Sequence, residues 1–159
     1  MRRPMLGVLV GGLIAGTFDI TYAIIRQAGR GRSPEWTLQS VATGWLGKAS
    51  FDGGAASAAL GLVSHYGIAI GAAGVFYLAS KFIPFLRERA VLSGLIFGVC
   101  VFLFMNWVLI PISAAPFKIP FNSQVVSEGF ASHALLFGVP IALAVRYFST
   151  SRAAPANAG

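Results

Sequence analysis

The stretch GLIAGTFDITYAII, residues 12–25, is apolar along most of its length and carries one charged side chain, Asp19. A helix of about 20 apolar residues crosses the roughly 30 Å hydrocarbon core of a bilayer, so this stretch and the residues before it predict a transmembrane helix. An ionisable group at that depth costs about 2.5–3.5 kcal/mol on insertion scales. We therefore expect Asp19 to face the interior of a helix bundle and to have a polar partner there.

The composition of the 159 residues is that of a membrane protein. It is 56% hydrophobic and 11% charged, with a mean hydropathy of +0.74, whereas soluble domains carry about 25% charged residues. The single cysteine, Cys100, lies in an apolar run. This excludes an intramolecular disulfide framework and predicts an inert, packed thiol.

Four apolar segments have the length of a membrane-spanning helix: about 5–25, 57–80, 90–110 and 129–148. The expected fold class is an all-α membrane protein, in which residues 1–148 form a single four-helix transmembrane domain and residues 149–159 a flexible C-terminal tail. The first segment also resembles a signal peptide, but its length and Asp19 favour a retained helix. Pro111 should end the third helix at Ile110, and Pro140 should kink the fourth near Gly138.

The first loop contains a short amphipathic segment, residues 34–46. Ser33 is a suitable N-cap and Pro34 a suitable first helical residue. Apolar residues then recur at the helical period and predict one apolar stripe, made of Leu38, Val41, Ala42 and Trp45. The helix is too short to span a bilayer. It lies at the interface, with Trp36 and Trp45 at headgroup depth, or it packs over the mouth of the bundle as a plug.

The net charge of +7 comes from basic residues that lie mostly outside the apolar segments. They form no single basic stripe, so we expect contact with anionic lipid headgroups and no nucleic-acid partner. An even number of helices places both termini on one side, which holds seven basic residues (Arg2, Arg3, Lys81, Arg87, Arg89, Arg146 and Arg152), while the other side holds five (Arg26, Arg30, Arg32, Lys48 and Lys118). The positive-inside rule then predicts cytoplasmic termini.

Four polar residues within the predicted spans form the candidate site: Asp19, His65, Asn106 and His133. At 1.5 Å per residue they lie roughly 6–15 Å below the face opposite the termini, and His65 is the deepest. Asp19 shares a helix face with Gly12, Gly16 and Ala23, and small residues mark the faces where membrane helices approach closely. His133 or His65 is therefore the expected partner of Asp19.

The sequence leaves several interpretations of this buried polar cluster open. The cluster can be structural, holding the helices in register through hydrogen bonds. It can be a proton or small-solute pathway, a haem b site with His65 and His133 as axial ligands, or a metal site that includes Asp19. No metal-ligand spacing supports the metal site. We predict no cofactor. We also predict no catalytic residue, because each histidine follows its serine directly and adjacent side chains on a helix do not face each other.

Two pairs of motifs suggest an internal repeat of two helices followed by two. Residues 12–16, GLIAG, resemble residues 94–98, GLIFG, and residues 61–67, GLVSHYG, resemble residues 129–135, GFASHAL. Glycines let membrane helices approach closely. The glycines at the ends of the first motif are therefore the expected helix-packing positions: Gly12, Gly16, Gly94 and Gly98.

Four stretches together resemble the YagU-like family of small bacterial inner-membrane proteins: GLIAGTFDITYA (12–23), the segment from SPEWTLQ to SHYGIA (33–69), MNWVLIPISAAP (105–116) and SHALLFGVPIAL (132–143). The resemblance covers most of the chain. It implies a four-helix, multi-pass protein of the bacterial inner membrane and implies no reaction. We expect a non-enzymatic accessory or interaction subunit of a larger membrane assembly, or a homo-oligomer. The alternative is a haem b, proton or small-solute site at Asp19, His65 and His133.

Overall fold

A computed structural model describes residues 3–116 and 123–150, and within them every regular element is helical. Four helices are long and apolar enough to span a membrane: Pro4–Ala28, Gly54–Phe82, Ala90–Ile112 and Ser123–Ser149. The first is α1 and the second is α3. The all-α, four-helix prediction is confirmed, and the chain is a multi-pass membrane protein. Arg2, Lys118, Arg152 and most of the predicted tail lie outside the described residues.

The third and fourth spans each contain a π-helical segment. The third consists of α5 (Ala90–Phe104), the π-helical η2 (Met105–Leu109) and α6 (Ile110–Ile112). The fourth consists of α7 (Ser123–Ser132), the π-helical η3 (His133–Gly138) and α8 (Val139–Ser149). Three shorter elements complete the fold: α2 (Pro34–Leu46), the 3₁₀ segment η1 (Gly47–Asp52) and α4 (Phe85–Glu88).

Both prolines lie just after these π-helical segments. Pro111 directly follows the π-helical segment and Ile110, and the third helix ends at Ile112, two residues beyond the expected end near Ile110. Pro140 is in the first turn of α8, directly after η3 ends at Gly138. The irregular turn in the fourth helix therefore precedes the proline, and it begins at His133.

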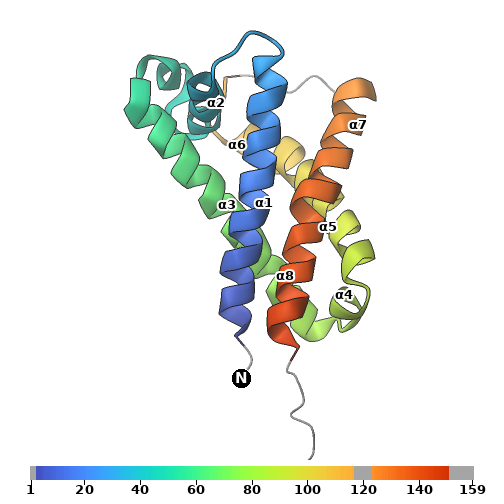
Figure 1. Cartoon of the computed structure of the whole chain (residues 1–159). Helices are drawn as coiled ribbons and strands as arrows, with labels where there is room; N and C mark the ends of the chain where they lie inside the picture. The colour runs from blue at the N-terminus through green and yellow to red at the C-terminus, as the bar shows by residue number, and fades with distance from the viewer. Residues whose placement is uncertain (1–2, 117–122, 151–159) are drawn as a thin grey trace, which may run out of the picture.

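Helix α1 lies in the middle of the bundle, with α3 on one side and α8 on the other (Figure 1). The third span packs against η3 and α8. Small residues make this close arrangement possible, since Ala15, Ala69 and Ala73 are fully buried next to Ile141 and Val145. The start of α1 and the end of α8 lie at the same end of the bundle (Figure 1).

The four glycines predicted at packing positions all lie at tight contacts between helices. A Cβ on Gly12 would lie 2.7 Å from Ile70 Cα, and a Cβ on Gly16 would lie 3.0 Å from the Tyr66 ring. In the second half, Gly94 meets Gly138 and Gly98 meets Ala134, each closer than 3 Å. In the first half, Gly16 and Gly12 meet the residues one and five positions after His65. In the second half, Gly98 meets His133 and Ala134, and Gly94 meets Gly138 and Val139, so the two halves pack in a similar register.

Helix α2 packs against the first part of α3. Its boundaries match the predicted segment, and Ser33 caps it by accepting a hydrogen bond from the N–H of Trp36 at 3.0 Å. Gly61 on α3 lets the α2 backbone approach, because a Cβ there would lie 2.8 Å from the carbonyl carbon of Leu38. The buried residues are Thr37, Gln39, Ala42 and Thr43, so the buried face is more polar than the predicted stripe.

Candidate functional site

His65 joins α3 to α1 by a hydrogen bond to the backbone. Its Nε2 lies 2.8 Å from the carbonyl oxygen of Gly16. A carbonyl only accepts, so Nε2 carries the proton and donates. The neighbouring Tyr66 hydroxyl lies 2.9 Å from Thr17 Oγ1 and adds a second polar contact between the same helices. Because Gly16 has no side chain, α3 comes close enough for the imidazole to reach the α1 backbone.

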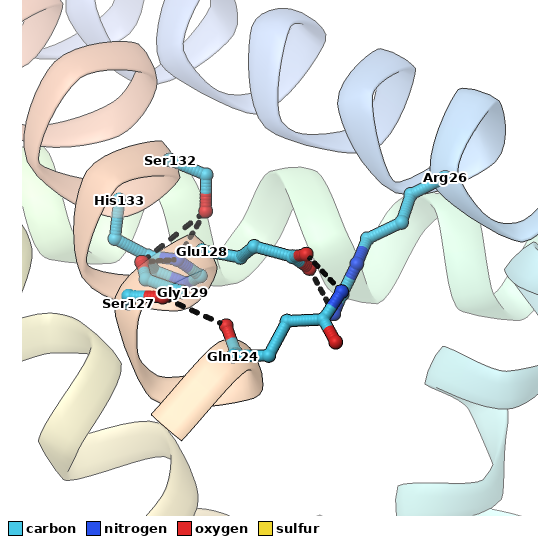
Figure 2. Close-up of polar contacts among 7 residues, drawn as sticks. All are labelled: Arg26, Gln124, Ser127, Glu128, Gly129, Ser132 and His133. Carbon is cyan, nitrogen blue, oxygen red and sulfur yellow. Dashed lines mark hydrogen bonds and ion pairs between the residues drawn. The ribbon is translucent and has the colours of Figure 1, made fainter. Parts of the chain in front are cut away.

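His133 occupies the equivalent position in the second half and bonds differently. Its Nδ1 donates to the carbonyl oxygen of Gly129, 3.1 Å away and one turn back on its own helix (Figure 2). Phe102 packs edge to face against the ring, with 5.3 Å between ring centroids. Within the described residues Nε2 makes no hydrogen bond. His133 therefore keeps one ring nitrogen available for chemistry.

Asp19 lies near His133 without touching it. The carboxyl group is half-buried on α1, and both Asp19 and His65 are within electrostatic range of His133. Among residues 3–116 and 123–150, however, no hydrogen bond or ion pair reaches the carboxylate. The structure thus gathers three of the predicted site residues, but it shows no direct Asp–His pair.

Asn106 is the fourth predicted site residue and bonds within its own helix. Its Nδ2 donates to the carbonyl oxygen of Phe102 at 2.8 Å. Its Oδ1 is buried and accepts no hydrogen bond from the part of the chain that the structure describes. No hydrogen bond among those residues joins Asn106 to Asp19, His65 or His133.

Sequence reasoning missed an ion pair that joins the first and fourth spans. Arg26, near the end of α1, pairs with Glu128 on α7, and Gln124 Nε2 donates to Glu128 Oε1 at 2.8 Å (Figure 2). The two charged side chains are 26% and 31% exposed. Glu128 precedes the predicted fourth span (129–148) by one residue, and Arg26 follows the predicted first span (5–25) by one residue. The available signal was the opposite charge of two residues at helix ends on the same side of the membrane.

The geometry limits the chemistry of the histidines. Ser132 Oγ donates to Gly129 oxygen at 3.2 Å, and His133 Nδ1 donates to the same oxygen, so Nδ1 has no lone pair with which to activate the serine. A haem on His65 Nε2 would require that nitrogen to leave Gly16. In the described part of the chain, no three His, Cys, Asp or Glu side chains are grouped to hold a metal ion.

No family model, curated protein or solved structure matches this chain. The contacts and chemistry of its own residues therefore have to indicate its function.

Proposed function

We propose that this protein is a non-enzymatic interaction subunit of a membrane assembly, and that the outer face of α3 receives a transmembrane helix of another subunit. The supporting observation is the environment of Gly67 and Gly71, four residues apart on α3. Both are exposed, and a Cβ on either would have nothing within 4 Å. The four predicted packing glycines, in contrast, all lie against another helix.

Gly67 and Gly71 lie in the middle of α3, where glycine lowers the stability of a helix, and no packing contact within the described chain explains why glycine occurs there. Glycine costs roughly 1 kcal/mol relative to alanine in a helix interior. Membrane helices recover that cost where a small-residue pair lets another helix pack against the backbone. Val63 and Val75 lie four residues before and after the glycines and are 71% and 60% exposed. No charged residue occurs from Gly54 to Ser80, so the matching partner is an uncharged helix with small residues of its own.

The bonds of the polar cluster support a structural role for His65. Its imidazole joins two helices, whereas Asn106 and His133 each bond within their own helix. Inter-helix bonds of this kind average about 0.6 kcal/mol in membrane proteins, yet they fix which faces meet. We therefore assign His65 to assembly of the bundle and to no reaction.

The proposed location is the bacterial inner membrane, with cytoplasmic termini. The resemblance to YagU-like proteins supports the inner membrane. Lys81 lies in the last turn of the second span, and Arg87 and Arg89 lie between that span and the third. These basic residues are at the end of the bundle where α1 begins and α8 ends, and positive charge favours the cytoplasmic side.

The test is the mass of the complex extracted in a mild detergent, measured by native mass spectrometry. Gly67→Ile should remove the associated chain and leave the free protomer. Ala131→Ile, at an exposed position on α7, is the matched control and should keep the complex. A wild-type protein that is extracted as a single chain, or a complex that survives Gly67→Ile, contradicts the proposal. A second copy of this chain as the partner supports a homo-oligomer.

A proton pathway through His133 is the second candidate. It is favoured by the free Nε2 of His133 within electrostatic range of Asp19, because Asp and His side chains form proton relays in membranes. In proteoliposomes, His133→Phe should abolish proton flux and His65→Phe should preserve it. Equal flux in protein-free liposomes and in wild-type proteoliposomes excludes this candidate.

A further inference from the structure

A crevice of about 510 Å³ lies between α2, α3 and the end of the third span. The backbone N–H of Ala114 donates to the carbonyl oxygen of Gly44 at 3.0 Å and holds the end of the third span against α2. The lining of the crevice is mainly apolar and includes Ile68, Met105 and Leu109. This volume, with an apolar lining and few polar groups, is typical of a binding site for a small apolar molecule.

Among the described residues that line the crevice, one hydroxyl group does not donate its hydrogen to another protein group. Ser40, Thr43 and Ser113 all line the crevice, but each donates to a backbone carbonyl of its own segment, at 2.6–2.8 Å. Ser64 differs, because its Oγ accepts a hydrogen bond from Trp45 Nε1 at 3.0 Å and, within the described residues, donates to no acceptor. The hydrogen bond from Trp45 therefore holds the Ser64 oxygen in place, and the Ser64 hydroxyl can still donate its hydrogen to a ligand.

The position of Ser64 along α3 indicates which ligand atom it would meet. Lys81 must lie near one surface, and about 20 residues of helix cross the hydrocarbon core, so the opposite boundary falls near Gly61. This boundary, counted back from Lys81, lies four residues deeper along α3 than the start at residue 57 expected from the sequence, so the depths expected for this helix become about 6 Å smaller. Ser64 then lies about 4–5 Å inside the boundary, and Ile68 lies about 6 Å deeper. The ester carbonyls of phospholipids lie close to this boundary, and their acyl chains extend inward from it.

We propose that the crevice binds one acyl chain of a membrane phospholipid, from the leaflet opposite the termini. The ester carbonyl accepts a hydrogen bond from the Ser64 hydroxyl, and the chain lies along Ile68, Met105 and Leu109. Trp45 positions the hydroxyl from the side. The lining belongs to two membrane spans and to α2, so a bilayer lipid enters without crossing water. This proposal does not depend on the interaction role of Gly67 and Gly71.

Two lipids that differ only in their linkage test the hydrogen bond without altering the protein. A diacyl phosphatidylethanolamine has the ester carbonyl, and its dialkyl ether analogue does not. Native mass spectrometry of the detergent-purified full chain, titrated with each lipid, should show one tightly retained diacyl lipid and about three- to tenfold weaker retention of the ether lipid, the effect of one hydrogen bond. Ser64→Ala should retain both lipids equally weakly.

A variant that fills the crevice tests the location. Ile68→Trp should lose the retained lipid, whereas Ile96→Trp, at a 55% exposed position on α5, should keep it. Equal retention of the ester and ether lipids by the wild type overturns the role of Ser64. Retention unchanged by Ile68→Trp overturns the crevice as the site. The wild-type comparison holds whether or not the tryptophan variant folds.

Discussion

The substitution Gly98→Ala tests the close packing between the third and fourth spans. The new Cβ would lie 2.6 Å from Ala134 Cα and closer still to the carbonyl of His133, whereas carbon atoms in contact prefer about 3.5–4.0 Å. Both neighbours are backbone, so the two helices would have to separate by about 1 Å. Overpacking of this kind costs about 1–3 kcal/mol, and the gain in helix propensity returns up to about 1 kcal/mol. We expect a net loss of about 1–2 kcal/mol.

The measurement is the free energy of unfolding in mixed micelles titrated with SDS, followed by circular dichroism. Gly71→Ala is the matched control, because it adds the same methyl group to a helix interior where nothing lies within 4 Å. In dilute protein that variant should be as stable as the parent or slightly more stable. If Gly98→Ala were as stable as Gly71→Ala, the helices would not meet at Gly98 and the packing register would be wrong.

Four further substitutions separate the roles of the polar side chains, all measured by the same SDS titration. His65→Phe should lower the unfolding free energy by about 0.6 kcal/mol through loss of the bond to Gly16, while His133→Phe should lower it less; equal losses would contradict the assigned difference. Asp19→Leu should not lower stability, because the carboxylate has no bonded partner among the described residues; a clear loss would reveal one. Glu128→Gln should let α1 and α7 separate at lower SDS than the parent, and an unchanged midpoint would show that the ion pair with Arg26 is not needed.

Hydropathy predicted the fold well because membrane helices follow one strong constraint. A chain in hydrocarbon must satisfy its backbone hydrogen bonds within each helix, and about 20 apolar residues are needed to span. The short helix was also predicted to the residue, since Ser33 and Pro34 give an unambiguous start. Its buried face was harder to predict, because Gln39 is buried only through a bond to the Gly54 carbonyl, a contact between segments.

The candidate site was predicted in part, for a related reason. Helical phase predicted an inward-facing Asp19, and the estimated depths favoured His133 or His65 as its partner, but neither indicated the groups to which these side chains bond. His65 bonds to a main-chain oxygen, which no side-chain pattern encodes. The third and fourth helices also contain π-helical turns at Asn106 and His133, and such a turn depends on how neighbouring helices pack.

The two histidines of the similar motifs GLVSHYG and GFASHAL have different bonds. Both lie in a similar register relative to a glycine pair on the facing helix, so position alone would give both the same bond. Helix α3 is regular at His65, and the imidazole reaches across to α1. The π-helical turn begins at His133, widens the helix there, and leaves the imidazole bonded to its own Gly129. The first half also carries Asp19, three residues after Gly16, where the second half has Val101 three residues after Gly98. The first half therefore contributes the Asp19 carboxylate, and the second half contributes His133 Nε2, which has no hydrogen bond within the described residues. A reaction that uses both groups would take place where the two halves meet.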